Sequence, residues 1–337
     1  MVRVLGEADV ARAISMQDGV RLVEEAIRQH AEGETTLLPR LSLDLSGNGG
    51  TFRVMSASMP QMGVFGLKTL TGYPGKRLPG ETYFAILLFS SENGALRSVM
   101  AAGHLTGIRT GAASGVAAKY LSREDAKVLG VFGAGVQAKQ QISALIAVRP
   151  ITLVKFFDVD RAKADALAAR TQEEFGIKTS VVENAREAVS GSDLVVTATT
   201  ARQPVFQGEW LEPGTHVSAV GANTPAKREV DAAAFQRSKI VVDFKDQALE
   251  EAGDLREVLR NGSITLDSIY AELGEIVTGK KGGRTSDTEI TLFKSVGIAI
   301  EDIATAVYVL EQAELRDLGT PIMFDGGVTS LVQGRAI

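Results

Sequence analysis

The 337-residue sequence predicts an α/β fold with a doubly wound parallel sheet in the middle of the chain and a second, discontinuous α+β domain beside it. Three observations predict the sheet. Within residues 127–138, an apolar run leads into a turn that contains Gly133 and Gly135. The next apolar run ends at Asp158. After Asp158, apolar runs and helix-like runs continue to alternate, which is typical of parallel strands connected by helices.

The N-terminal region begins with an amphipathic helix, which we expect at residues 15–32. Met16, Val20, Val23 and Ile27 recur there at a spacing of three to four residues, with charged residues between them. One side of this helix is therefore expected to cover a sheet.

Residues 37–100 change to short strands separated by turns, so the region is predicted to be largely β. The expected strands are Leu41–Leu45, 51–57, 64–71 and 82–89. A helix rich in small residues is expected at 105–121. The polar residues 122–125 after it are predicted to form the hinge into the middle region.

The middle region supplies the strands and helices of the parallel sheet. Besides the first apolar run, we expect a helix at Arg161–Phe175 and strands at 152–157, 179–182, 193–197, 215–220 and 239–244. A helix-prone stretch at 269–277, a loop at 279–284 and a strand at 289–293 are expected to follow.

A long helix at 297–313 has a wide apolar face, so it is expected to pack back against the N-terminal region. The first domain is then discontinuous and consists of residues 1–122 with 297–325. Residues 123–296 are predicted to bind a dinucleotide, and the glycine-rich residues 326–337 are predicted to be a tail.

Composition and charge exclude several classes of function. The chain has no cysteine and only three histidines, and the histidines are scattered, so neither a metal site nor a thiol nucleophile is expected. The net charge of -5 and the lack of long basic runs argue against a nucleic-acid partner. No apolar run reaches the length of a membrane span, and the N-terminus does not resemble a secretory signal. A cytoplasmic protein is expected.

The glycine-rich turn is the candidate cofactor site. A strand that ends at Gly133 and Gly135 and restarts as a helix exposes backbone N–H groups where a pyrophosphate can bind. An ordinary strand-to-helix turn is the alternative for the turn alone, but the position of Asp158 favours a Rossmann domain. The Asp158 carboxylate would accept hydrogen bonds from ribose and repel a 2′-phosphate, which favours NAD(H). Arg161, nearby, leaves NADP(H) open.

The substrate site is predicted from cations in unusual settings. Lys68 lies within the apolar segment VFGLKTL, and Arg109 lies in a helix of small residues. A bound carboxylate would offset the cost of burying these charges, although snorkelling or an internal ion pair is the alternative. Arg40 and Arg53 lie near turns, where exposed cations are ordinary. A bidentate arginine clamp would orient a small carboxylate substrate over a nicotinamide ring.

Six segments stand out along the chain: PRLSL from Pro39, FGLKTLTGYPG from Phe65, GIRTGAASG from Gly107, VFGAGVQAK from Val131, AVGANTPAKREVD from Ala219 and AELGEIVTGKKGGRTSDTEITLFKSVG from Ala271. In this order they resemble the ornithine cyclodeaminase/μ-crystallin family. The resemblance implies a Rossmann domain, a substrate-binding and dimerisation domain, and a homodimer. It assigns the substrate carboxylate to Arg40, Lys68 and Arg109, and the cofactor loop to Gly133, Gly135 and Gln137. The complete set of candidate cofactor residues is Thr110, Gly133, Ala134, Gly135, Val136, Gln137, Asp158, Thr197, Val220, Gly221 and Ser295.

Two positions depart from the cyclodeaminase branch of the family. That branch carries a glutamate at the position of Arg53, where it binds the side-chain amine of ornithine, and an arginine would repel this amine. It also carries an aspartate at the position of Asn223, as does the related alanine dehydrogenase. An amide cannot act as a carboxylate base, so both departures argue against ornithine deamination.

The leading hypothesis is therefore an NAD(H)-dependent imine reductase or amino-acid dehydrogenase that acts on a small α-imino or α-amino carboxylate. Reduction of an imine needs hydride, a proton and a carboxylate clamp, and Asn223 suits this chemistry. Lys68 is the candidate proton donor, although a purely electrostatic role is open. A cyclodeaminase that recycles its NAD and a non-catalytic nucleotide-dependent binding protein are the alternatives.

Overall fold

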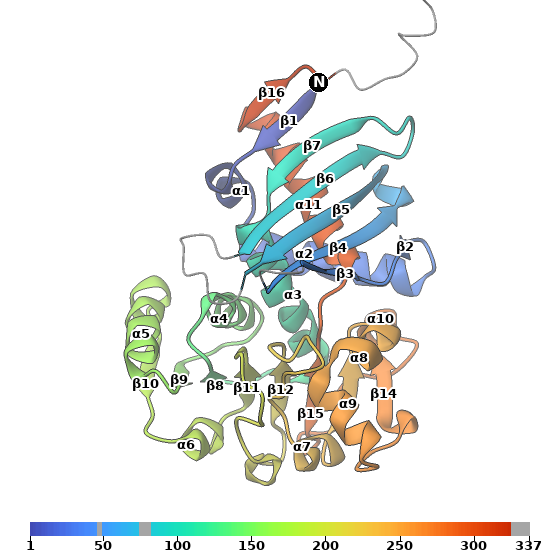
Figure 1. Cartoon of the computed structure of the whole chain (residues 1–337). Coiled ribbons are helices and arrows are strands. Elements are labelled where there is room, and N and C mark those ends of the chain that lie inside the picture. The colour runs from blue at the N-terminus through green and yellow to red at the C-terminus, as the bar shows by residue number, and fades with distance from the viewer. Residues whose placement is uncertain (46–48, 74–81, 325–337) are drawn as a thin grey trace, which may run out of the picture.

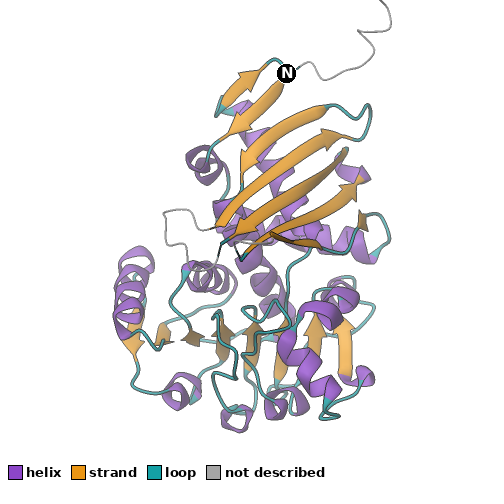
Figure 2. Cartoon of the chain, viewed as in Figure 1, coloured by secondary structure: helices purple, strands orange, loops and turns teal. Residues whose placement is uncertain are grey.

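Two large β-sheets dominate the computed structural model, which describes residues 1–45, 49–73 and 82–324. Figure 1 shows one sheet above the other, with helices packed on both. Figure 2 shows that the lower sheet has helices on both of its sides. The α/β fold class with a parallel sheet is confirmed. The predicted tail, residues 326–337, lies outside the described residues.

The upper sheet has the strand order β16-β1-β7-β6-β5-β4-β2, with β3 also paired to β4. Its pairs are antiparallel except β1 and β7, which run parallel. Because β16 comes from the C-terminal end, both ends of the chain contribute to one sheet. The strands are β1 Val2–Leu5, β2 Thr36–Leu37, β3 Leu41–Leu45, β4 Gly50–Met59, β5 Val64–Gly72, β6 Thr82–Ser90, β7 Leu96–Ala101 and β16 Thr320–Ile322.

One face of the upper sheet packs on helices and forms a large core. Met55, Ile86 and Leu88 point into this core, because alternate residues of a strand share one face. The helices are α1 Glu7–Ala13, α2 Met16–Ala31, α3 Gly103–Leu121 and α11 Ala299–Leu315. Helix α11 contacts β4, β5 and β6 as well as α2 and α3, so the long C-terminal helix does pack back on the N-terminal region.

Helix α2 begins where its sequence predicts. The Ser15 hydroxyl accepts a hydrogen bond from the Asp18 backbone N–H at 3.2 Å, and the Asp18 carboxylate accepts one from the Ser15 backbone N–H at 3.1 Å. This reciprocal pair satisfies two backbone donors at the start of the helix. The predicted apolar residues Val20, Val23 and Ile27 are buried in the large core, where α2 packs mainly on α3 and α11.

The lower sheet is parallel throughout, in the order β10-β9-β8-β11-β12-β15-β13-β14. The chain moves outward from β8 in one direction and resumes at β11 in the other, so a topological switch point lies between β8 and β11. Ligands of such sheets bind outside the carboxyl ends of the strands at this point. The strands are β8 Val128–Phe132, β9 Leu153–Phe157, β10 Lys178–Val181, β11 Leu194–Thr197, β12 His216–Ala219, β13 Lys239–Val242, β14 Ile269–Glu272 and β15 Thr291–Lys294.

The remaining helices lie between and around these strands. They are α4 Val136–Val148, α5 Arg161–Phe175, α6 Ala185–Val189, α7 Ala232–Gln236, α8 Lys245–Glu251, α9 Gly253–Arg260 and α10 Leu273–Val277, with 3-10 turns η1 Pro60–Met62, η2 Gly208–Trp210 and η3 Leu266–Ser268. Within the described residues, every helix is too short or too polar to cross a bilayer.

The prediction of a helix over residues 269–277 is wrong for its first four residues. They form β14, which pairs with β13, and only Leu273–Val277 is helical. The alternating burial of Ile269 and Ala271 is that of a strand, and the available edge of β13 decides the conformation. Analysis of the sequence also did not identify β1, α1 and β7 as separate elements.

Candidate functional site

A cavity of about 160 Å³ lies between the two sheets. The upper sheet, with α3, supplies one side, and the start of α4 and the segments after β12 and β15 supply the other. The cavity is lined by Arg40, Arg53, Met55, Lys68, Leu70, Phe84, Thr106, Arg109, Thr110, Gln137, Val220, Asn223, Ser295, Val296 and Gly297. It therefore brings together all four predicted cations, Asn223, and the candidate cofactor residues Thr110, Gln137, Val220 and Ser295.

Lys68 enters the cavity wall from β5. It is 1% exposed, because its side chain points to the helix-covered face of the sheet. The Lys68 Nζ donates to Asp302 Oδ1 at 2.7 Å, which uses one of its three N–H donors. Burial, reinforced by the positive charge of Arg109, lowers the pKa of Lys68 to about 7 against the opposing effect of Asp302.

Arg109 reaches the same acidic pair from α3. Its Nε donates to Asp302 Oδ1 at 2.9 Å, and its Nη1 donates to Glu301 Oε2 at 2.9 Å. Burial lowers the pKa of Arg109, but the two carboxylates outweigh burial and raise it. The guanidinium packs on Gly297, where a Cβ would lie 2.3 Å from Nη1 and where φ is +78°. A glycine is therefore required beside this arginine.

Lys68 and Arg109 thus form an internal ion-pair network. This is the alternative that the sequence left open, and the expectation that their burial requires a bound carboxylate is wrong. Glu301 and Asp302 do not line the cavity, whereas Lys68 and Arg109 do. The acids lie behind the cations, and Arg109 Nη2 has no hydrogen bond to another described residue. The cations therefore keep donors for a ligand.

The sequence analysis missed Glu301 and Asp302, although a signal was present. Both acids stand in the apolar segment VGIAIEDIATA, which leads into and begins α11, and both are fully buried. The argument applied to Lys68 and Arg109, that a buried charge needs a partner, applies equally to them. Burial raises the pKa of Glu301 to about 7, against the opposing charge of Arg109.

Arg40 is not an ordinary turn cation. Its side chain is 7% exposed and is ion-paired with Glu251 at the end of α8. The Arg40 Nη2 donates to the carbonyl oxygens of Val296 at 2.9 Å and Gly297 at 3.1 Å. Arg40 therefore fastens the segment after β15 to the upper sheet.

Arg53 differs from the other three cations. It lies on β4 and is half-buried in the cavity wall. No hydrogen bond or ion pair joins its guanidinium to another described residue. Arg53 is thus the cavity cation whose charge no described carboxylate contacts.

Asn223 lies on the opposite wall, in the loop after β12. Its Oδ1 accepts from Lys227 Nζ at 3.3 Å. The buried Glu229 holds the start of this loop, since its carboxylate accepts from the backbone N–H groups of Gly221 at 2.6 Å and Ala222 at 3.1 Å. Glu229 also accepts from the Thr197 hydroxyl at 3.0 Å. The predicted cofactor residues Thr197 and Gly221 therefore use these donors, a hydroxyl group and a backbone N–H, on Glu229.

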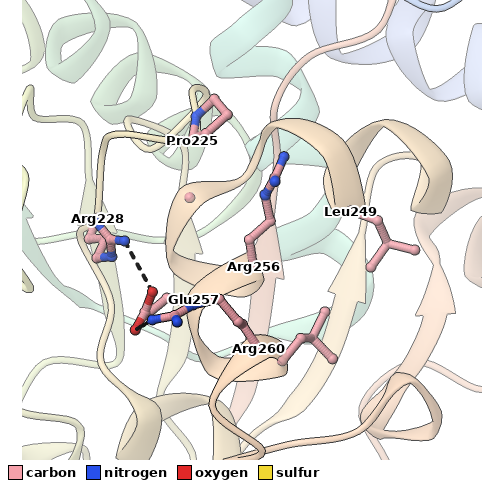
Figure 3. Close-up of a pocket in the computed structure, with 8 residues that line it drawn as sticks. Pro225, Arg228, Leu249, Arg256, Glu257 and Arg260 are labelled. Atoms are coloured by element: carbon pink, nitrogen blue, oxygen red, sulfur yellow. Dashed lines mark hydrogen bonds and ion pairs between the residues drawn. The ribbon is translucent and has the colours of Figure 1, made fainter.

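The end of the same loop is fastened to α9 beside a surface hollow (Figure 3). Arg228 and Glu257 point toward one another there, with their charged groups 3.1 Å apart, and Arg260 also contacts Glu257. A Cβ at Gly253 would lie 2.2 Å from the Lys227 carbonyl oxygen, so α9 packs directly on the loop backbone. No predicted site residue lines this hollow, which instead braces the loop that carries Asn223.

Two more predicted cofactor residues, Thr110 and Ser295, donate hydrogen bonds from their hydroxyl groups to the protein. The Thr110 hydroxyl donates to the Thr106 carbonyl oxygen at 2.7 Å, within α3. The Ser295 hydroxyl donates to Asp243 Oδ2 at 2.9 Å, and Asp243 also accepts from the N–H groups of Val296 and Gly297. Their hydroxyl oxygens can still accept a hydrogen bond.

The turn between β8 and α4 fits a dinucleotide. Gly133 has a φ of +97°, and a Cβ there would lie 2.6 Å from the Ala198 carbonyl oxygen, whereas a Cβ at Gly135 would meet open space. Helix α4 has no side-chain cap at its N-terminus, so its first N–H groups are available to a pyrophosphate. Gln137 Oε1 is buried without a hydrogen-bond partner in the described structure. The exposed Val136 and the half-buried Ala134 complete this turn.

Among the described residues, no three histidine, aspartate or glutamate side chains are arranged to hold a metal ion.

Known proteins are similar to this chain over most of its length. The sequence model of the ornithine cyclodeaminase/mu-crystallin family matches residues 2–317. An alanine dehydrogenase of Archaeoglobus fulgidus is 41% identical over 325 residues, which are 95% of this chain and 98% of the relative. The structure of Thermococcus litoralis Δ1-pyrroline-2-carboxylate reductase, in complex with NADH and L-proline, has a TM-score of 0.92 and 38% identity over 95% of this chain and 100% of that one. An archaeal alanine dehydrogenase dimer with bound NAD has a TM-score of 0.90 and 39% identity over 96% of this chain and 99% of that one.

Proposed function

The chain belongs to the ornithine cyclodeaminase/mu-crystallin family, and we propose that it is an NAD(H)-dependent imine reductase or amino-acid dehydrogenase. Its substrate is a small α-imino carboxylate, and the reaction places hydride on the α-carbon. The family resemblance read from the sequence is confirmed. The relatives described above are alanine dehydrogenases and a pyrroline-2-carboxylate reductase. The structure of the reductase contains NADH, and that of the archaeal alanine dehydrogenase contains NAD.

One observation carries the proposal. Lys68 and Arg109 line a cavity at the carboxyl ends of the strands of a parallel, Rossmann-type sheet. The unused donors of Arg109 and Lys68 bind the substrate carboxylate, and this fixes the orientation of the α-carbon. Nη1 and Nη2 of Arg40 donate to Glu251 and two carbonyl groups, so Arg40 holds the segment after β15 in place, while its buried Nε has no hydrogen-bond partner among the described residues. Arg53 faces the substrate side chain.

The turn residues of β8 and α4 would hold NADH, which supplies the hydride when bound. Asp158 would accept hydrogen bonds from the ribose of the adenosine half. Thr110, Gln137, Val220 and Ser295 would line the nicotinamide side, since all four lie in the cavity wall.

The proton of the reaction comes from Lys68. Reduction of a C=N bond places hydride on carbon and needs one proton on nitrogen. A pKa of about 7 lets the Lys68 ammonium give up this proton near neutral pH. Asn223 can donate a hydrogen bond from its amide but cannot act as a carboxylate base, so the site suits reduction better than deamination of ornithine.

A cofactor-oxidation assay tests this function. The purified protein with NADH is given 1-pyrroline-2-carboxylate, 1-piperideine-2-carboxylate, or pyruvate with ammonia. Oxidation of NADH by at least one of them is expected, and no oxidation by any would overturn the proposal. Release of ammonia from ornithine or lysine without net change in NADH would instead identify a cyclodeaminase. Cofactor binding without turnover of any substrate would identify a non-catalytic binding protein.

The same proposal includes a homodimer formed through the outer face of the upper sheet. This face is apolar, with Leu41, Leu43, Phe65 and Tyr83 all exposed. Phe65 and Phe89 stack there on neighbouring strands, with ring centroids 5.2 Å apart. A wide exposed apolar sheet face is the usual sign of a protein partner, and a second copy of the chain fits this face by symmetry.

The domain boundaries and the location of the protein also belong to the proposal. We assign substrate binding and dimerisation to residues 1–122 with 297–325, and dinucleotide binding to residues 123–296. The strands of each sheet fall within these ranges, which supports the division. We retain the cytoplasm as the proposed compartment.

A further inference from the structure

Asp302 joins the two cations of the substrate site through a single oxygen atom. Its Oδ1 accepts from Lys68 Nζ at 2.7 Å and from Arg109 Nε at 2.9 Å. We propose that Asp302 is a positioning residue, which sets the orientation of both cations toward the substrate and favours the protonated form of Lys68. This inference rests on the proposed function and extends it to a residue outside the cavity wall.

The contacts of Asp302 are poorly arranged for stability alone. The residue is fully buried, yet its Oδ2 has no hydrogen-bond partner among the described residues. A buried acceptor without a partner is costly, and a buried ion pair contributes little net stability. The arrangement does connect three elements, because Lys68 of β5 and Arg109 of α3 both bind Asp302 of α11. Both cations also line the cavity.

Asp302 lies in the first turn of α11, at the N-terminal end of the helix dipole, which interacts favourably with negative charge. Its carboxylate faces Lys68 and Arg109 from there.

The charged groups around Lys68 explain why the offset matters. Arg109 from α3 and Arg40 from the segment before β3 both lower the pKa of Lys68, and burial lowers it further. Asp302 from α11 is the carboxylate that opposes them. Glu301 contacts Arg109 but not Lys68, and Arg53 lines the same cavity. Loss of the Asp302 charge would therefore lower the pKa of Lys68 further and reduce the charged fraction of Lys68 at pH 7.

Glu301 provides a matched control. It is the neighbouring acid on the same helix, is equally buried, and is bonded to the same arginine, but it has no contact with Lys68. Glu301→Gln and Asp302→Asn each remove one buried carboxylate of α11. They differ in whether Lys68 loses its partner.

The experiment measures kcat and KM for imine reduction, and the affinity of the NAD-loaded enzyme for pyrrole-2-carboxylate, at several pH values in the wild type and both variants. In Asp302→Asn we expect KM at pH 7 to rise about tenfold or more, in line with the loss of a charge-assisted hydrogen bond. The midpoint of the pH dependence of pyrrole-2-carboxylate binding moves to lower pH in this variant. Acidification partly restores binding. In Glu301→Gln this midpoint stays near that of the wild type.

The outcomes separate this inference from the proposed function. A wild type that reduces no imine contradicts the proposed function. An active wild type, with an Asp302→Asn variant that keeps the wild-type KM and midpoint, overturns the role of Asp302, as does an equal shift in Glu301→Gln. If Asp302→Asn does not fold, Asp302→Glu keeps the charge but moves the carboxylate. That variant is expected to keep the midpoint and raise KM, and an unchanged KM would overturn the inference.

Discussion

Asp158 accepts a hydrogen bond from the backbone N–H of Ala134, with 2.8 Å between Oδ2 and the nitrogen. The acid at the end of β9 is thereby held against the glycine-rich turn at the start of α4. Its other oxygen accepts from the backbone N–H of Asp160 at 2.8 Å, within the next turn. The carboxylate is thus fixed where the ribose of a dinucleotide on this turn would lie.

The Asp158→Ala variant is expected to tolerate NADPH better than the wild type does. Removal of the carboxylate removes its repulsion of a 2′-phosphate, an effect of about 1–4 kcal/mol for charges in contact near a surface. The ratio of kcat/KM with NADPH to that with NADH should rise at least about tenfold, since about 1.4 kcal/mol corresponds to a factor of ten. Glu173→Gln, at an exposed acid of the same α5, is the control. An unchanged ratio would mean that a residue other than Asp158 recognises the ribose.

Much of the fold could be predicted from local sequence patterns. Helix Arg161–Phe175 and strand Leu41–Leu45 match the expected bounds. The helix lies between the capping residues Asp160 and Gly176, and the strand alternates apolar and polar residues. Strand β14 could not be predicted in this way, because pairing with β13 overrides its helix-like composition. The insertion of β15 between β12 and β13 is a tertiary choice that no local pattern encodes.

The candidate site was likewise only partly predictable from local sequence patterns. Lys68 and Arg109 were identified because a charge among apolar residues is anomalous in any fold. Their neutralisation by Glu301 and Asp302 depends on where α11 packs, and this is not visible in one sequence. Arg40 looked ordinary beside its turn, since its partner Glu251 lies far along the chain.

Arg53→Glu should change the side-chain preference of the enzyme. Arg53 contacts no described carboxylate, so it is expected to favour acidic or neutral side chains and repel ammonium groups. The variant should raise kcat/KM for basic imino acids relative to neutral ones by about tenfold or more, given typical discrimination by one polar contact. The exposed Arg170→Glu should leave the ratio unchanged. Equal ratios in Arg53→Glu and wild type would remove Arg53 from the side-chain pocket.

Affinity for a carboxylate ligand should depend on the protonation of Lys68. Burial holds the pKa of Lys68 at about 7, so the charged form prevails below this value and is lost above it. Binding of pyrrole-2-carboxylate, which cannot be reduced, should weaken as pH rises through about 7. The Lys68→Met variant should bind weakly without this transition. A transition of the same size in Lys68→Met would assign it to another group, such as Glu301.

Dimerisation should depend on the outer face of the upper sheet. Phe65→Asp places a charge at the centre of an apolar face, and the loss of a large buried side chain is worth about 2–3 kcal/mol even before the charge is buried. Light scattering over a range of concentrations should show a dimer for the wild type and a monomer for the variant. Leu266→Asp, at an exposed leucine of the lower sheet region, should remain dimeric. A monomeric wild type would contradict the proposed dimer.

The central claim is that the cavity between the sheets directs hydride from the cofactor to the α-carbon of an imino carboxylate held by Lys68 and Arg109. Its most direct measurement is transfer of deuterium from NADH deuterated at both C4 positions to 1-pyrroline-2-carboxylate, with the product analysed by mass spectrometry and NMR. The account predicts proline that carries deuterium at its α-carbon, and little product from Arg109→Met. Proline with no deuterium at that carbon, or full activity in Arg109→Met, would contradict it.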